Sequence, residues 1–131
     1  KETESTSSIL NLSSIAARRT RPGLMGYSIS SAALNQMTRT MAIALAPYNI
    51  RVNALSFGSV MSESLKNALK EDQDLRSEII KNTPLGRIAP ASEIAQAAQF
   101  LCSEASTFVT GEVMTIDGGR SLLDPVNIGA H

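Results

Sequence analysis

The sequence predicts an α/β fold with a parallel sheet, and two features indicate it. Short apolar stretches typical of strands alternate with longer stretches of helical periodicity, in the order strand, helix, strand, helix, helix, strand. Strands that are joined through helices run parallel, because each helix returns the chain to the same end of the sheet. Three short strands make a poor parallel sheet, which needs both faces covered. The pattern therefore indicates half of a domain, or a domain that a partner completes.

The first half of the chain predicts a strand, a loop and a long helix. The strand is expected over residues 8–13, and residues 18–26 have the Arg, Pro and Gly composition of a loop. A helix is expected over residues 27–46, ending before Pro47. Its apolar positions recur every three or four residues: Ala33, Leu34, Met37, Met41, Ala44 and Leu45. Such a stripe packs into the core or binds a partner, and core packing is the simpler interpretation.

The second half predicts two strands and two helices. Residues 50–55 alternate as a strand should, and Ser62 is positioned to cap a helix over residues 63–81. Pro90 is expected to open a further helix at its first turn. Residues 112–116 alternate as the last strand, which the Asp-Gly-Gly sequence at 117–119 ends.

Composition excludes several classes of protein. The 131 residues suit one domain, and 43% hydrophobic residues suffice for a core. The 12 basic and 12 acidic residues balance, which argues against nucleic acid as a partner. No apolar run reaches the length of a membrane span, and no signal-peptide pattern is present. The single cysteine, Cys102, belongs to no Cys/His cluster, so we expect no metal and a cytoplasmic location.

Two hydroxyl-bearing residues are candidates for chemistry. Ser14 follows the first strand, and Tyr27 begins the long helix. A hydroxyl at a strand end and a phenol on the next helix can converge at the carboxyl edge of a parallel sheet, where such folds bind ligands. Taken singly, a serine in a turn and a tyrosine in packing are the ordinary interpretations.

A chain of linked motifs adds context to these two residues. They occur in this order: SILNLSS, YSISSAALN, NIRVNALSFGSVMS, NTPLGRIAPASEIAQAAQFLCSEAS and VTGEVMTIDGG. Together they resemble the carboxyl-terminal half of the short-chain dehydrogenase/reductase family, especially its 3-oxoacyl-carrier-protein reductases, sugar dehydrogenases and hydroxysteroid dehydrogenases. The resemblance implies half of a doubly wound, Rossmann-like parallel-sheet domain, as a single partial domain over residues 1–131. Because the chain begins with Lys1 rather than Met, we expect a longer parent.

The resemblance implies a role for each matching residue. Ser14 matches the serine that hydrogen-bonds the substrate oxygen, and Tyr27 matches the tyrosine that exchanges its proton. Gly58, Val60 and Ser62 match the segment near the nicotinamide carboxamide. The resemblance also implies NAD or NADP as cofactor, a small carbonyl or alcohol substrate, a mobile lid over residues 62–81, and homo-oligomers paired through the helix at 27–46.

Three departures weaken this match. The cofactor-binding lysine of the family, four residues after the tyrosine, is here Ser31, which can hydrogen-bond but has no charge to favour a phenolate. Phe57 stands where the family commonly has proline. The chain contains neither a glycine-rich phosphate loop nor the asparagine-bearing segment of the family site. We therefore expect this chain by itself to bind a dinucleotide poorly, if at all, and to be inactive.

Three hypotheses remain open on whether the protein is an enzyme. The first is a fragment of an NAD(P)-dependent oxidoreductase. The second is a degenerate, non-catalytic relative that acts as an assembly or regulatory subunit. A third, less favoured, is an enzyme that works without the lysine, and an arginine of the loop, Arg18, Arg19 or Arg21, is a weak candidate to replace it.

Overall fold

A parallel three-stranded sheet forms the centre of the computed structural model, which describes residues 6–124 and 126. Its strand order is β1 (Ser7–Ser14), β2 (Ile50–Phe57) and β5 (Val113–Ile116). Both pairs are parallel, which confirms the predicted parallel α/β fold. Lys1 and both ends of the expected domain over residues 1–131 lie outside the described residues.

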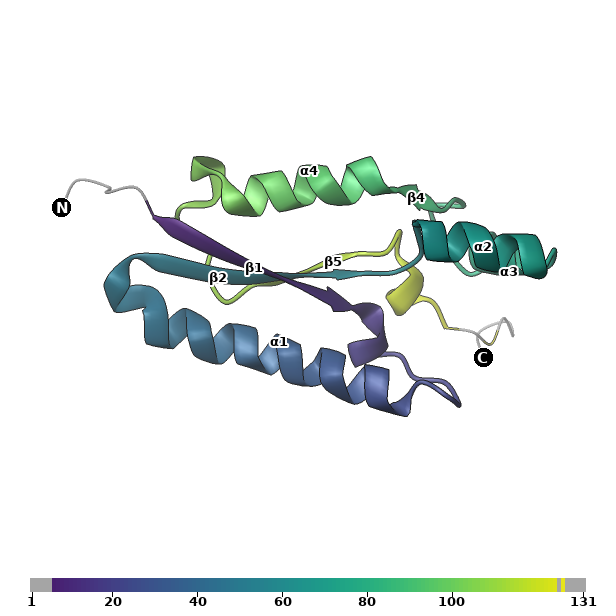
Figure 1. Cartoon of the computed structure of the whole chain (residues 1–131), viewed down its shortest axis with the longest axis horizontal. Helices are drawn as coiled ribbons and strands as arrows, with labels where there is room; N and C mark the ends of the chain where they lie inside the picture. Colours follow the sequence, from purple (N-terminus) through teal and green to yellow (C-terminus); the bar gives the residue numbers. More distant parts are fainter. Residues whose placement is uncertain (1–5, 125, 127–131) are drawn as a thin grey trace, which may run out of the picture.

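One long helix covers each face of the sheet. α1 (Met25–Leu45) packs on β1 and β2 from one side, and α4 (Ala91–Cys102) packs on the same strands from the other (Figure 1). The central strand β2 is consequently buried on both faces, and Val52, Ala54 and Leu55 have no exposed surface. Residues 50–55 alternate in polarity, yet Arg51 and Asn53 are buried as well, because both donate hydrogen bonds to the segment before β5.

The buried face of α1 differs from the expected one. The buried positions are mostly small and polar: Ser28, Ser31, Asn35, Thr38 and Ala42. They recur at intervals of three and four, as one helix face requires. The expected apolar stripe lies elsewhere: Met37 is exposed, and Met41 and Leu45 are only half-buried. The preference for core packing of these apolar residues was therefore wrong, because hydrogen bonds let a polar face lie on the sheet.

Those hydrogen bonds join α1 directly to β1. Asn11 Nδ2 donates to Thr38 Oγ1 at 3.0 Å, and Thr38 Oγ1 donates to Leu34 O at 2.8 Å. Ser13 Oγ donates to Ser31 O at 3.3 Å. Asn11, Ser13 and Thr38 thus find partners within the protein, whereas Ser28 Oγ and Asn35 Oδ1 on the same helix face have no hydrogen-bond partner among the described residues.

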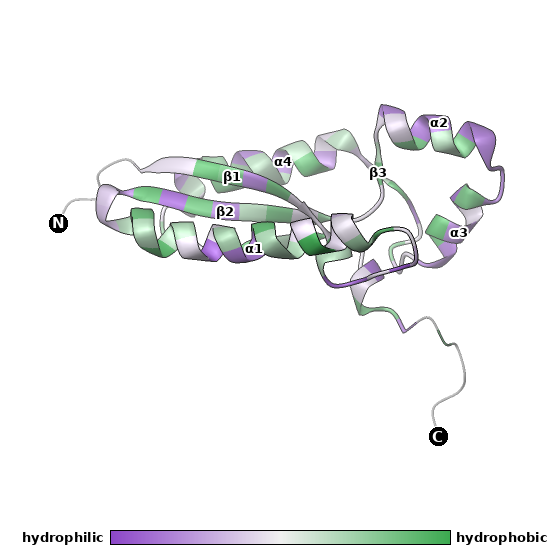
Figure 2. Cartoon of the chain, turned by 60° about the horizontal axis from the view of Figure 1, so that its bottom comes forward, coloured by the Kyte–Doolittle hydropathy of each residue, from purple (hydrophilic) through white to green (hydrophobic). Residues whose placement is uncertain are grey.

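A second small unit stands at the end of the sheet. It contains β3 (Val60–Met61), α2 (Glu63–Glu71), α3 (Leu75–Lys81) and β4 (Ala89–Pro90), and β3 pairs with β4. Figure 2 shows α2 and α3 projecting away from the main sheet. The single helix expected over residues 63–81 was wrong, because Asp72 interrupts it. The Asp72 carboxylate accepts from the backbone N–H groups of Asp74 and Leu75, which starts a new helix.

The expected helix after Pro90 is confirmed, and Pro90 is its N-cap residue. Within the described residues, no helix has both the length and the hydropathy that crossing a bilayer requires. The same residues contain no group of three or more His, Cys, Asp or Glu side chains that could bind a metal ion.

Candidate active site

The carboxyl ends of all three strands meet at one edge of the sheet. In the strand register Ser14 lies opposite Phe57, and Phe57 lies opposite Ile116. The residues that follow these ends therefore share one edge, which is where parallel α/β sheets bind ligands.

Ser14 is fixed at this edge by its own backbone. It is buried and is the N-cap residue of a short 3₁₀ turn over Ile15–Ala17. Its Oγ accepts a hydrogen bond from Ala16 N at 3.1 Å. This bond uses one lone pair of the oxygen, so the O–H group can still donate to a ligand.

Tyr27 lies in the first turn of α1, which contacts both the 3₁₀ turn after Ser14 and β1. The residue is 54% exposed, so its side chain is accessible to solvent. The structure thus carries Ser14 and Tyr27 on two elements that pack against each other. That the two hydroxyl groups converge on one ligand stays a prediction.

Ser31 lies one helical turn after Tyr27 and is buried against β1. Its carbonyl oxygen accepts the hydrogen bond of Ser13 already described. The neutral side chain at this position therefore provides no cation close to the phenol. Arg19 is engaged elsewhere, since its guanidinium donates to Ser121 O at 3.1 and 2.7 Å and also to Leu123 O.

Gly58 allows the three strand ends to approach one another. Its N–H donates to Ile116 O at 3.1 Å. A Cβ at this position would lie 3.1 Å from Asp117 Cβ and 3.4 Å from Ile15 Cδ1. A side chain here would press on both neighbouring strand ends, so glycine keeps this edge compact. Phe57, which precedes it, is half-buried.

Val60 and Ser62 lie at the start of the second small unit, just after the chain leaves β2. Val60 pairs with Ala89, and Ser62 N donates to Val60 O at 2.7 Å. Ser62 Oγ accepts from Leu65 N at 3.1 Å, which confirms that this serine caps the helix. The same hydroxyl can donate to a ligand while it caps α2.

The structure adds one residue that sequence reasoning treated only as part of a turn. The Asp117 carboxylate accepts from Gly119 N at 2.9 Å and from Ser121 N at 2.7 Å. Burial raises the pKa of this carboxyl, but hydrogen bonds from Ser121 and Gly119 and the nearby Arg120 outweigh it, so the pKa is lowered. The Asp-Gly-Gly sequence was the available signal, because Asp commonly accepts from backbone two residues on.

One hydrogen bond joins the segments after β5 and β2, and one ion pair joins the second unit to α4. Arg120 Nη1 donates to Ser59 Oγ at 2.6 Å, which connects the turn after β5 to the segment after β2. Arg87, which precedes β4, binds Glu93 of α4 through two contacts of 2.8 Å. Hydrogen bonding with Arg87 lowers the pKa of Glu93.

Comparison with known proteins identifies relatives of the whole segment. The profile of a family described as "Enoyl-(Acyl carrier protein) reductase" matches residues 1–121. The chain is 34% identical to 7alpha-hydroxysteroid dehydrogenase of Escherichia coli K12, over 85% of this chain and 43% of that protein. It is also 34% identical to 3-oxoacyl-[acyl-carrier-protein] reductase FabG of Chlamydia trachomatis, over 86% of this chain and 44% of that protein.

Solved structures of short-chain dehydrogenases have the same fold as this chain over the segment that they share with it. A gluconate 5-dehydrogenase from Burkholderia cenocepacia, in complex with NADP and tartrate, superimposes with a TM-score of 0.84 at 33% identity and covers 91% of this chain. A 7 alpha-hydroxysteroid dehydrogenase complexed with NADH and 7-oxo glycochenodeoxycholic acid gives 0.80 at 34% identity, over 86% of this chain. The chain spans less than half of each of these two structures, 46% and 43%.

Proposed function

The chain belongs to the short-chain dehydrogenase/reductase family of NAD(P)-dependent oxidoreductases, and on this premise we propose that it is part of an enzyme that moves a hydride between nicotinamide and a carbonyl or secondary alcohol. The single observation that carries the proposal is the placement of Ser14 and Tyr27 on contacting elements at the carboxyl edge of the sheet. The proposal assigns them as the catalytic pair.

In this proposal each hydroxyl has a separate task. The Ser14 O–H donates a hydrogen bond to the carbonyl oxygen and orients the substrate, while the backbone N–H of Ala16 holds Ser14 Oγ in place. The Tyr27 phenol gives its proton to the same oxygen as the carbonyl carbon accepts hydride, and the π electrons of the carbonyl become the new O–H bond. In the reverse direction Tyr27 takes the proton. NAD or NADP, when bound, supplies or accepts the hydride.

The residues of the chain fit the nicotinamide end of this cofactor only. Gly58, Val60 and Ser62 follow the carboxyl end of β2, and a backbone hydrogen bond joins Ser62 N to Val60 O. Ser31 offers a hydroxyl but no ammonium for the ribose, and the sequence has no glycine-rich loop for the phosphates. We therefore propose that this chain alone binds the dinucleotide weakly.

A non-catalytic role as an assembly or regulatory subunit is the second candidate. Two observations favour it: the neutral Ser31 beside the phenol, and the apolar residues that α1 presents to solvent. We propose in either case that α1, the helix expected over residues 27–46, pairs with a second copy of the protein. Arg39 is the one charged residue of this helix, and unpaired apolar surface favours association.

The experiment that tests catalysis uses the gene product containing this chain, with NADH and NADPH and a panel of ketones. We expect Tyr27→Phe to lower kcat by about 10²- to 10⁴-fold without weakening cofactor binding, because it removes only the proton donor. Tyr48→Phe changes the other tyrosine, which is exposed, and should leave kcat unchanged.

A second pair of variants tests the effect of serine at position 31, where the family has lysine. Ser31→Lys should raise kcat if the missing ammonium limits the reaction, whereas Ser30→Lys adds the same charge on an exposed neighbouring position and should not. Absence of NAD(P)H binding and turnover in the gene product and in Ser31→Lys would overturn the catalytic proposal in favour of the non-catalytic one. Turnover that is insensitive to Tyr27→Phe would overturn the assignment of the pair.

A further inference from the structure

One arginine attaches the loop after Ser14 to the turn after β5. Arg19 lies five residues after Ser14, and its guanidinium donates to Ser121 O through Nε at 3.1 Å and Nη2 at 2.7 Å. The same Nη2 also donates to Leu123 O. A planar guanidinium that binds two carbonyl oxygens is held in one orientation, which a single surface contact would not ensure. Arg19 therefore fastens together two segments that are far apart in the sequence.

The backbone between Ser14 and Arg19 carries this attachment to the serine. The N–H groups of Arg18 and Arg19 both donate to Ile15 O at 2.9 Å, and Ile15 directly follows Ser14. Ala16 N donates to Ser14 Oγ, as described above. The residues after Ser14 thus form one hydrogen-bonded turn, with Ser14 Oγ bonded at its start and the Arg19 guanidinium bonded just past its end. Displacement of Arg19 would therefore be felt at Ser14.

The turn that receives Arg19 is itself held in place. Ser121, whose carbonyl oxygen binds Arg19, donates its own N–H to Asp117 Oδ2 at 2.7 Å. Arg120, in the same turn, donates to Ser59 Oγ in the segment after β2. This turn thus connects the carboxyl ends of β5 and β2, and Arg19 adds the carboxyl end of β1.

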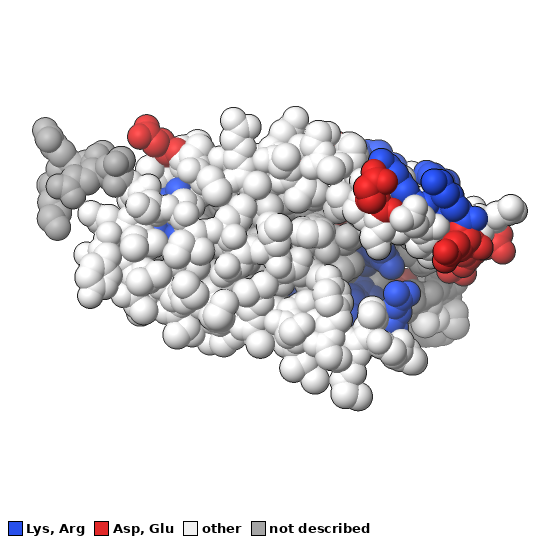
Figure 3. Space-filling model, viewed as in Figure 1, with Lys and Arg blue, Asp and Glu red and all other residues white. Residues whose placement is uncertain are grey.

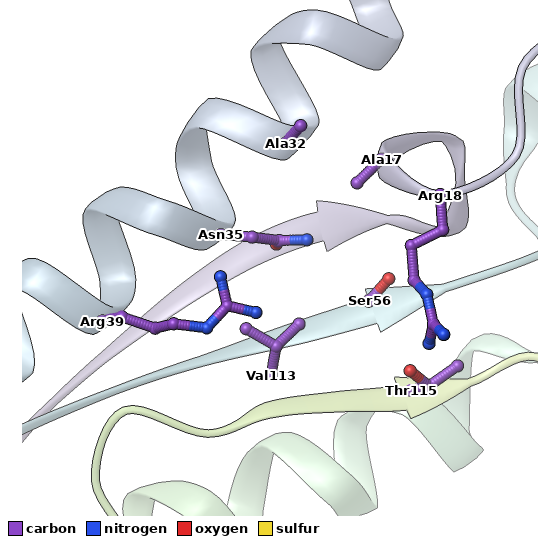
Figure 4. A pocket seen from close by; sticks show the side chains of 8 residues that line it. All are labelled: Ala17, Arg18, Ala32, Asn35, Arg39, Ser56, Val113 and Thr115. Carbon is purple, nitrogen blue, oxygen red and sulfur yellow. The ribbon is translucent and has the colours of Figure 1, made fainter.

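The neighbouring arginine has a different position. Figure 4 shows Arg18 extending from the end of the 3₁₀ turn past Ser56 of β2 toward Thr115 of β5. Together with Arg39 of α1, it lines a pocket of about 310 Å³ between α1 and the sheet. Arg18 therefore lies against the face of the sheet, whereas Arg19 reaches the turn after β5.

Ser14 needs support from outside the sheet because it is the last residue of its strand. Within the described residues β1 pairs with β2 alone, and this pairing ends with Ser14 opposite Phe57. Residues 18–24, which lead from there to α1, are neither helix nor strand. A displacement of about 1 Å in a group that orients the substrate can lower the rate about a hundredfold. An anchor for this loop is therefore relevant to the chemistry.

We propose that Arg19 is a positioning residue: by binding Ser121 O and Leu123 O it holds the loop after β1 and so fixes the Ser14 hydroxyl. This role rests on the proposed function, in which Ser14 orients the carbonyl oxygen of the substrate. Arg19 acts through the backbone and Ser14, and not as a substitute for the ammonium that is missing at Ser31.

Amide hydrogen exchange tests the fixing of Ser14 without any catalysis. The probe is the N–H of Ala16, because it donates to Ser14 Oγ. In the whole gene product containing this chain, we expect Arg19→Met to speed exchange at Ala16 by about tenfold, the effect of about one charged hydrogen bond. Arg19→Lys keeps a donor for Ser121 O and should restore much of the protection.

Two controls accompany the exchange measurement. Arg21→Met removes an arginine from another exposed position of the loop and should leave exchange at Ala16 unchanged. The N–H of Leu55, which is fully buried in β2, reports on unfolding of the whole domain and should be affected far less by Arg19→Met. Unchanged exchange at Ala16 in Arg19→Met, or equal acceleration at Leu55 or in Arg21→Met, would overturn the proposal.

A double-mutant cycle tests the catalytic consequence. Arg19→Met should lower kcat by about tenfold and leave the KM for NAD(P)H within about twofold, because Arg19 acts on the placement of Ser14. Ser14→Ala removes the hydroxyl that Arg19 positions, so adding Arg19→Met to it should lower kcat by less than about twofold. An equal loss in both backgrounds would overturn the proposal, because a merely structural residue, or a replacement cation, would act without Ser14. A gene product without turnover would overturn the proposed function instead, and exchange at Ala16 would still decide whether Arg19 fixes Ser14.

Discussion

At the scale of single residues, Gly118 is where the turn after β5 meets the second small unit. Its φ is +62°, and a Cβ there would lie 2.7 Å from Thr83 Cγ2. Leu85 N also donates to Gly118 O at 3.1 Å. Thr83 is buried and bonded to Ile79 O, so it cannot easily move away. Both the backbone conformation and the available space therefore require glycine.

Alanine variants at two glycines should separate these two requirements. Gly23 has φ +85° but nothing within 4 Å of an added Cβ, so Gly23→Ala should cost only the backbone strain, about 1 kcal/mol. Gly118→Ala should cost about 2–4 kcal/mol, because the contact with Thr83 adds to the strain. Urea unfolding measures both values. Equal costs would show that Thr83 moves aside.

Asp117 makes stability depend on pH. A folded-state pKa below the ordinary value of 3.8 means that the carboxylate contributes stability above that pH, and that the contribution is lost as pH falls through the lowered pKa. We expect Asp117→Asn to lose about 1 kcal/mol near neutral pH, with the difference from the natural protein shrinking as pH falls through the lowered pKa of Asp117. Asp74→Asn, whose side chain makes no cap hydrogen bond, is the control in urea unfolding at each pH. A difference that does not change with pH would contradict this.

At the scale of elements, Arg51 connects β2 to the chain segment between α4 and β5. It is buried, and its guanidinium donates to Thr6 Oγ1 at 2.8 Å and to Ser106 Oγ at 3.1 Å. It also donates to Val109 O and Ser103 O, each at 3.2 Å. One side chain thus supplies the donors for a connector that forms little regular structure of its own.

Arg51→Met should therefore be more damaging than the loss of an ordinary charge. The methionine keeps much of the volume but leaves the carbonyls of Ser103 and Val109 without this donor, which we expect to cost about 3 kcal/mol. Arg76→Met, at an exposed position of α3, should change the free energy of unfolding by less than about 0.5 kcal/mol. Urea unfolding compares the two variants, and similar values would exclude this role for Arg51.

At the scale of the whole molecule, charge and apolar surface are separated. Figure 3 shows acidic and basic side chains gathered over the end that carries α2 and α3, while most of the remaining surface in this view has neither. On α1, Ile29 is 62% exposed and Ile43 is 78% exposed. Exposed apolar residues on a helix with one charge are typical of a surface that another subunit covers.

The double variant Ile29→Lys with Ile43→Lys tests whether α1 pairs two copies. If it does, the molar mass of the gene product, measured by light scattering after gel filtration, should fall to that of a smaller assembly, because the charges would be buried in the interface. Leu85→Lys places a lysine at an exposed leucine away from α1 and should leave the mass unchanged. An unchanged mass in the α1 variant would exclude pairing through this helix.

The sequence by itself determined the order and type of the main elements and the parallel direction of the strands, whereas the grouping of Ser14 and Tyr27 at one edge stays a prediction. The order and type of the elements follow from local periodicity and turn residues. The parallel direction of the strands follows from the rule that helical crossovers return the chain to the same edge. Motif spacing likewise sufficed for the family, which the matched profile and relatives confirm.

Only the tertiary structure decided what depends on contacts between distant segments. The face of α1 that is buried follows from hydrogen bonds to β1, so Thr38 and Asn35 point inward although their polarity predicts the opposite. The pairing of β3 with β4, the bonds of Asp117 and the pocket between Arg18 and Arg39 likewise join residues far apart in the chain. Periodicity describes one element at a time, so it cannot reveal which polar groups the folded chain brings together.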